Sequence, residues 1–128
     1  MKKYAITNEA QAGPAHGPYS QALVCDHLFY TGVIGSDATG EVVSDKVYEQ
    51  TIRCLENTEA FLKEAGGSLA DVINVTVYLL QMSDFDEMNR AYKEKFVDAP
   101  KPARATVAVH EMLPGVKVEM VVTAYLEN

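Results

Sequence analysis

The chain has 128 residues, a length that fits one domain with its own hydrophobic core. Its 18 acidic and 11 basic residues give a formal net charge of −7, and no run of Lys and Arg is dense enough to follow a phosphate backbone, so nucleic acid is a poor partner. No apolar run approaches the length of a membrane span and nothing resembles a cleaved leader, so we expect a cytoplasmic protein in which Cys25 and Cys54 are reduced core residues.

The first third of the chain is predicted to contain short strands and a loop. Residues 4–6 are expected to form an edge strand, and residues 9–17 are too rich in Gly, Pro and Ala for regular structure. Pro18 stiffens the backbone before Tyr19, which either holds this aromatic ring at a fixed place or leaves it an ordinary, partly buried aromatic. Residues 22–25 and 28–34 are rich in Val, Leu, Phe and Tyr and predict a hairpin.

An amphipathic helix is predicted over residues 46–65. Residues 35–44 form a loop before it, and Ser44 or Asp45 is expected to cap its first turn. Apolar residues recur at three- and four-residue intervals along the segment. The pair Gly66 and Gly67 is expected to end the helix, because the chain must there adopt a left-handed conformation.

A strand and a second helix follow. Residues 72–80 alternate, with one face made of Ile73, Val75, Val77 and Leu79. Ser83, with an acid three residues later, resembles a capping box for a helix with an apolar stripe of Phe85, Met88, Tyr92 and Phe96. Asn89 lies beside that stripe, either as a helix-edge residue bonded to a loop or as a functional group.

Residues 102–126 are expected to form two strands that return antiparallel through a turn at Pro114 and Gly115, a pair that suits the centre of a type II turn. Alternation divides these strands into two faces. The apolar face is Ala105, Val107, Val109, Val118, Met120, Val122, Ala124 and Leu126. The opposite face is Arg104, Thr106, Ala108, His110, Glu119, Val121, Thr123 and Tyr125. Arg104 and Glu119 are thus expected on the same side of the sheet.

The order of elements predicts an α+β sandwich with two helices on one face of the sheet. The other face is less polar than a solvated sheet, which predicts burial in a homo-oligomer whose sheets face inward. A partly buried Arg104 and Glu119 then form either a simple ion pair or a site for a small carboxylate near a water-activating group.

Other chemistries have no signature in this sequence. His16, His27 and His110 lack the spacing of metal ligands, and the two cysteines are far apart. The chain contains no glycine-rich phosphate loop, dinucleotide fingerprint or nucleophile elbow. We therefore expect neither a metal nor a cofactor.

Five motifs resemble the RidA (YjgF-type) reactive-intermediate deaminase family. They are Gly17–Gln21, Tyr30–Gly35, Asp84–Asn89, Pro102–Arg104 and Val118–Met120, and they follow the family's order over nearly the whole chain. The resemblance implies one domain over residues 1–128 with a chorismate-mutase-like α+β fold. It also implies a homotrimer whose sheets line a barrel, with ligand clefts between subunits.

The same resemblance implies an activity in metabolite damage control. Members of the family hydrolyse enamines and imines, such as 2-aminoacrylate, to 2-keto acids and ammonia without a cofactor. By position, Arg104 is expected to bind the substrate carboxylate and Glu119 to position the attacking water. The expected substrate-binding residues are Arg104 with Tyr19, Thr31, Asn89 and Thr106.

The chain departs from the family's pattern at several positions. Thr106 stands where many members have cysteine, which excludes a thiol-dependent step, and Thr31 adds a methyl group to the family's hydroxyl. Val33 replaces a common glutamine, and His110 replaces a small residue. A small-carboxylate-binding or chaperone-like trimer without efficient catalysis therefore remains an alternative. A ribonuclease or translation inhibitor is a further alternative, which the net charge disfavours.

Overall fold

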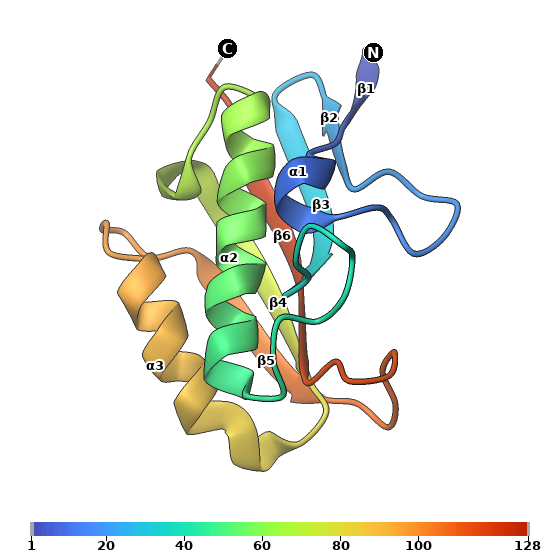
Figure 1. The fold of residues 1–128 in the computed structure, drawn as a ribbon. Helices are drawn as coiled ribbons and strands as arrows, with labels where there is room; N and C mark the ends of the chain where they lie inside the picture. Colours follow the sequence, from blue (N-terminus) through green and yellow to red (C-terminus); the bar gives the residue numbers. More distant parts are fainter. Residues whose placement is uncertain (1, 128) are drawn as a thin grey trace.

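The computed structural model describes residues 2–127 and is built around a mixed sheet (Figure 1). Its six strands have the order β1-β2-β3-β6-β4-β5. Their bounds are Lys3–Ile6 for β1, Ala22–Cys25 for β2, Leu28–Ile34 for β3, Val72–Leu79 for β4, Ala103–Ala108 for β5 and Val118–Tyr125 for β6. Neighbouring strands are antiparallel except β4 and β5, which are parallel.

Two long helices cover one face of this sheet. Helix α2 spans Val47–Glu64 and packs beside α3, which spans Phe85–Lys95 (Figure 1). The remaining helical segments are short: α1 at Glu9–Ala12, and the 3₁₀ turns η1 at Leu69–Asp71 and η2 at Met82–Asp84. The α+β class and the placement of two helices on one sheet face are confirmed. In residues 2–127 no helix has both the length and the hydropathy needed to cross a membrane.

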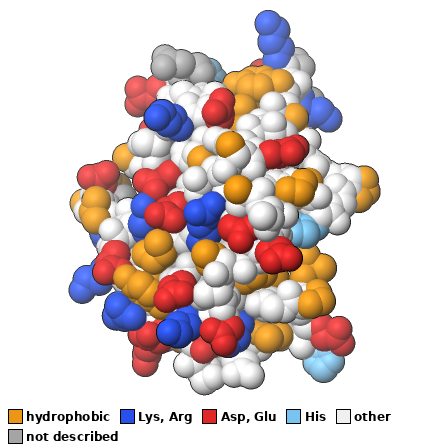
Figure 2. Space-filling model, viewed as in Figure 1, with side chains coloured by type: hydrophobic (Ala, Val, Ile, Leu, Met, Phe, Trp, Pro, Cys, Tyr) orange, Lys and Arg blue, Asp and Glu red, His pale blue; other side chains and the backbone are white. Residues whose placement is uncertain are grey.

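The core lies between the sheet and the helices. On β6 the residues Val118, Met120, Val122 and Ala124 are buried, as the alternation predicted. Helix α2 adds Cys54, Leu55, Phe61 and Leu62. The outer surface of the helices carries interspersed acidic and basic side chains (Figure 2), as expected for a solvated face. Cys54 is buried, Cys25 is half-buried, and both are free thiols.

The predicted N-terminal strands and the first long helix are confirmed. Strand β1 lies at an edge of the sheet, and β2 and β3 form the expected hairpin around Asp26. Gly66 has a φ of 87° just after α2, as the helix end requires. The loop prediction for residues 9–17 is wrong in its first part. Helix α1 forms there because the side chain of Asn8 accepts a hydrogen bond from the Gln11 N–H and so caps it.

The predicted helix caps differ from those in the structure. Neither α2 nor α3 has a side-chain cap, although the Ser44 hydroxyl oxygen accepts a hydrogen bond from the Lys46 N–H just before α2. The Ser83 capping box is wrong, because η2 occupies residues 82–84 and leads directly into α3. A capping box does form at Ser68 and Asp71, where it opens η1.

Strand β4 follows its predicted alternation except at its start. Val75, Val77 and Leu79 are fully buried. Ile73 was expected on their face, but its side chain is 50% exposed. The cause is an irregularity in the pairing with β6 between Val72 and Asn74, which reverses the faces at that point.

The predicted hairpin of residues 102–126 is wrong, although its turn is correct. Val116 N–H donates to the Leu113 carbonyl at 3.0 Å and Gly115 has a φ of 83°, as a type II turn requires. The strands on either side of the turn are not neighbours, because β4 lies between β5 and β6. Strand β5 is therefore an edge strand, parallel to β4.

Candidate functional site

Arg104 is a half-buried cation at the edge of the sheet. It pairs in register with Val75 of β4 and so shares the helix-covered face with that core residue. Its guanidinium carbon lies 4.7 Å from the centre of the Tyr92 ring and 5.6 Å from that of Phe85. One guanidinium nitrogen, Nη1, donates a weak hydrogen bond to the Met88 sulfur at 3.9 Å.

No carboxylate in residues 2–127 forms an ion pair with Arg104. The ion pairs of this region join Glu87 to Arg90, Glu59 to Lys95 and Glu111 to His110. The aromatic rings attract the guanidinium but give its N–H groups no oxygen acceptor. A half-buried arginine whose N–H groups lack an oxygen partner has the chemistry to bind a carboxylate, because its planar fork matches both carboxylate oxygens.

The local sequence explains this position of Arg104. The predicted stripe of α3 is confirmed: Met88, Tyr92 and Phe96 are buried and Phe85 packs against the core. These side chains flank the edge of the sheet at β5. Pro100 and Pro102 restrict the backbone between α3 and β5, so Arg104 follows a stiff segment.

Two buried hydroxyl groups near Arg104 have no hydrogen-bond partner in residues 2–127. They belong to Tyr92, whose ring contacts the guanidinium, and to Thr106. Thr106 pairs with Val77 and lies on the same face as Arg104, two residues further along β5. Asn89 is half-buried on α3. We refer to Arg104, Thr106 and Asn89 as the arginine group.

Glu119 lies on the opposite face of the sheet. It is half-buried on β6 and pairs with Ile34 of β3 and Tyr78 of β4, while its chain neighbours are buried under the helices. Desolvation by burial raises the pKa of the Glu119 carboxyl above its ordinary value. A carboxylate with a raised pKa is a stronger proton acceptor, which suits a group that activates water.

The expectation that Arg104 and Glu119 share one side of the sheet is therefore wrong. The expectation assumed that β5 pairs directly with β6. In the structure Arg104 pairs with Val75, and Val75 pairs with Val122 of the buried face. Pairing with β4 therefore decides which residues of β5 face the helices. Arg104 lies under α3, and the apolar residue Val107 lies on the free face.

Thr31 lies on β3, the neighbour of the strand that carries Glu119, and Tyr19 lies in the loop that leads to β2. Tyr19 is exposed on the loop before β2, and its hydroxyl oxygen accepts a hydrogen bond from the His16 N–H at 3.0 Å. With Gly32 and other residues it lines a cavity of about 30 Å³. Thr31 is buried on β3, where its hydroxyl donates to the Gln21 carbonyl at 2.6 Å and fixes the end of that loop.

The site residues thus form two groups within one chain. We refer to Glu119 and Tyr19 as the glutamate group, whereas Thr31 pairs with Val122 and so lies on the helix-covered face, opposite to Glu119. Strands β6 and β4 separate β3 from β5, and Glu119 faces away from α3. The arginine and glutamate groups therefore do not meet within one chain.

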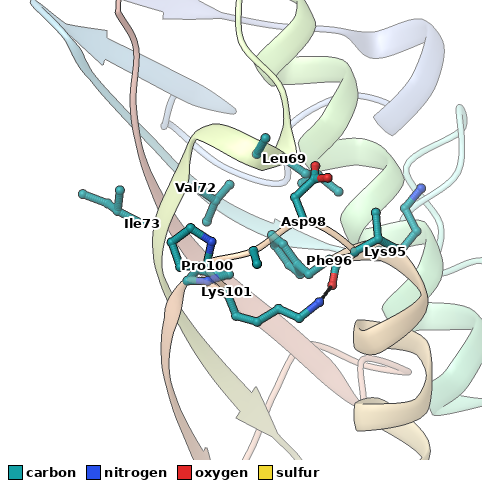
Figure 3. Close-up of a pocket in the computed structure, with 12 residues that line it drawn as sticks. Leu69, Val72, Ile73, Lys95, Phe96, Asp98, Pro100 and Lys101 are labelled. Atoms are coloured by element: carbon teal, nitrogen blue, oxygen red, sulfur yellow. Dashed lines mark hydrogen bonds between the residues drawn. The ribbon is translucent and has the colours of Figure 1, made fainter.

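A cavity of about 340 Å³ adjoins the segment that leads to Arg104. It lies between the start of β4 and the segment after α3, and Leu69, Val72 and Phe96 form much of its wall, whereas the Ile73 side chain points away from them (Figure 3). Lys101 reaches its rim and donates a hydrogen bond to the Phe96 carbonyl, and Lys95 pairs with Glu59. The lining of the cavity is therefore mixed, because the charged side chains of Lys95, Asp98 and Lys101 accompany the apolar ones. Within residues 2–127 no group of three His, Cys, Asp or Glu side chains could hold a metal ion.

Some structurally important polar residues were missed by the sequence analysis. Gln50 and Asn57 are fully buried on α2. Asn57 donates to the carbonyls of Ile34 and Ser36, and Gln50 joins two loops to the start of β6. The signal was their spacing, because both recur with Cys54 and Phe61 on the buried side of α2.

Comparisons with known proteins place this chain in a protein family. A family described as endoribonuclease L-PSP matches residues 9–126. A RutC family protein of Pyrococcus abyssi is 46% identical over 99% of this chain and 100% of its own length. The chloroplastic Reactive Intermediate Deaminase A of Arabidopsis thaliana is 37% identical over 94% of this chain and 64% of its own.

A solved structure shows the same fold with a small molecule bound. Escherichia coli TdcF with bound serine is 33% identical, covers 95% of this chain and 98% of its own, and superposes with a TM-score of 0.87. The family match spans most of the chain, and the Pyrococcus relative matches it over nearly its whole length. The chain therefore belongs to the endoribonuclease L-PSP family, also called the RidA (YjgF-type) family.

Proposed function

We propose that the protein hydrolyses reactive enamine and imine intermediates, such as 2-aminoacrylate, to 2-keto acids and ammonia. The observation that carries this proposal is Arg104, a half-buried guanidinium that has no carboxylate partner in residues 2–127. The relation to a reactive intermediate deaminase supplies the reaction class. Arg104 binds the substrate carboxylate and so fixes the position of the adjacent C=N carbon.

The remaining chemistry needs a proton acceptor near this carbon. An enamine first takes the imine form, and water then adds to the C=N carbon to give a carbinolamine. Glu119 accepts the proton of the attacking water, which its raised pKa favours, and returns it to the departing nitrogen. Loss of ammonia leaves the keto acid, so the reaction consumes only water and requires no cofactor.

The two groups of residues meet only if two copies of the chain come together. The free face of the sheet supports this, because it exposes large apolar side chains: Tyr30, Ile73, Val107, Val121 and Tyr125. We propose a homotrimer of chorismate-mutase-like subunits whose sheets face inward around a barrel. In each cleft the arginine group of one subunit faces the glutamate group of its neighbour.

The departures from the family's pattern are compatible with this reaction. Thr106 offers a hydroxyl that donates hydrogen bonds, and no step of the hydrolysis requires a thiol. Val33 is buried under the helices, so it affects packing and does not reach the free face. His110 follows β5 and is almost fully exposed.

A coupled assay tests the proposal. A dehydratase generates 2-aminoacrylate, and the release of keto acid is followed with the wild type, Arg104→Ala and the control Arg90→Ala, which removes an exposed arginine of α3. We expect acceleration by the wild type and by the control, and its loss in Arg104→Ala. Equal acceleration by all three proteins would refute the site.

A carboxylate-binding protein without catalysis is the second candidate. It is favoured by the serine bound to the related E. coli protein. Under this alternative the wild type binds a 2-keto acid through Arg104 but does not accelerate keto-acid release. A ribonuclease has less support, because the net charge of −7 opposes binding to a phosphate backbone.

A further inference from the structure

Tyr92 has a feature that core packing does not explain. Its side chain is only 8% exposed, and its ring centre lies 4.7 Å from the Arg104 guanidinium carbon and 4.6 Å from the centre of the Phe96 ring. Its hydroxyl oxygen is buried and has no hydrogen-bond partner in residues 2–127. Burial of a hydroxyl without a partner costs free energy.

A phenylalanine at this position would keep the packing without that cost. The same stripe of α3 already contains Phe85 and Phe96, so aromatic rings without a hydroxyl fit this helix face. The second unpartnered hydroxyl, that of Thr106, lies on the face of β5 that carries Arg104. Within residues 2–127, the Arg104 guanidinium therefore contacts the ring of a tyrosine whose hydroxyl has no partner, and it shares a face of β5 with a second hydroxyl that has none.

We propose that Tyr92 is a substrate-binding residue: its ring holds the Arg104 guanidinium, and its hydroxyl, together with that of Thr106, donates a hydrogen bond to the carboxylate that Arg104 binds. This inference rests on the proposed function, since it assumes that Arg104 binds a carboxylate.

The hydrogen-bonding capacities of these groups match. A carboxylate accepts about four hydrogen bonds, of which the arginine fork supplies a pair and the two hydroxyls supply the others. Burial raises the pKa of Tyr92 to about 12, so its phenol stays protonated and remains a donor at neutral pH. The site therefore suits a 2-imino or 2-keto acid with a free carboxylate and not its ester or amide.

Calorimetric titration with 2-oxobutanoate, together with thermal unfolding of the ligand-free protein, tests this inference. The variants are Tyr92→Phe, Thr106→Val and Arg104→Ala. The matched control is Tyr48→Phe, which removes a tyrosine hydroxyl bonded to Glu94 on the outer side of the helices. Tyr92→Phe and Thr106→Val should each weaken binding about tenfold, as expected for loss of a hydrogen bond to a charged group. The control should bind as the wild type does.

Thermal unfolding separates a ligand-binding role from a structural one. If the Tyr92 hydroxyl serves the ligand, Tyr92→Phe leaves the Tm of the ligand-free protein unchanged or raises it, while affinity falls. A lower Tm overturns the inference, because it shows that the hydroxyl has a partner in the protein. Unchanged affinity in Tyr92→Phe, with binding lost in Arg104→Ala, overturns the role of Tyr92 alone. Absence of binding by the wild type, or equal binding by Arg104→Ala, overturns the carboxylate site itself.

Discussion

Replacing Gln50 by methionine tests how the fold positions Glu119. Gln50 is fully buried on α2 and makes three hydrogen bonds to distant backbone groups. Its amide nitrogen donates to the Ser44 carbonyl at 2.8 Å and to the Gly115 carbonyl at 2.9 Å, and its oxygen accepts from the Lys117 N–H at 2.9 Å. Lys117 immediately precedes β6, the strand that carries Glu119.

The expected loss of stability follows from these contacts. Methionine has a similar length, so Gln50→Met leaves no large cavity, and each lost hydrogen bond costs about 1 kcal/mol. Water can replace some of the lost hydrogen bonds, because Gly115 is exposed and Ser44 is half-buried. We therefore expect the free energy of unfolding to fall by about 2 to 3 kcal/mol, which lowers the Tm of a domain of this size by about 10 °C.

The assay is urea and thermal unfolding at fixed protein concentration, since an oligomer makes Tm depend on concentration. The matched control is Gln81→Met, at an exposed glutamine, which should change the free energy of unfolding by less than about 0.5 kcal/mol. The proposed deaminase activity should also fall in Gln50→Met, because the start of β6 loses its fixed position. A variant as stable and as active as the control would refute this account of Gln50.

Three further outcomes follow from the geometry. Gly35→Ala should fail to fold, or its free energy of unfolding should fall by several kcal/mol, because the new Cβ would lie 2.4 Å from the Gln50 carbonyl oxygen. The control Gly32→Ala, whose new Cβ has nothing within 4 Å, should unfold as the wild type does. Glu119→Gln should raise the free energy of unfolding at neutral pH, because the raised pKa of Glu119 means that its charged form is disfavoured in the folded state. Protonated Glu119 contributes stability to the folded protein, and this contribution is lost as the pH rises through its folded-state pKa. In urea unfolding, the free energies of unfolding of the two proteins should therefore converge below about pH 4. A difference in the free energy of unfolding that persists at low pH would contradict desolvation of Glu119 as its cause.

The sequence predicted most elements because their signals are local. The spacing on α2, the Gly66 stop and the Pro114–Gly115 turn each depend on a few neighbouring residues, and the structure confirms them. The short helix α1 was missed because its cap, Asn8, precedes the segment that composition marked as a loop.

The faces of the site residues could not be predicted in the same way. The predicted alternation within β6 was correct. Which residues of β5 share a face with those of β6, however, depends on β4, because β4 pairs with both strands. The rings of α3 accommodate Arg104 on the helix-covered face, where the alternation of apolar residues alone predicts an apolar side chain. The irregularity near Ile73 is a further long-range feature with no local signal.

The central claim is that the arginine group of one subunit and the glutamate group of another form each site. Subunit complementation tests it most directly. Arg104→Ala and Glu119→Gln, each inactive alone, are unfolded, mixed in equal amounts and refolded, and deamination of 2-aminoacrylate is measured against wild type treated in the same way. If each site takes one group from each of two chains, random assembly restores about a quarter of wild-type activity. No activity above that of the separate variants would contradict the claim and place each site within a single chain.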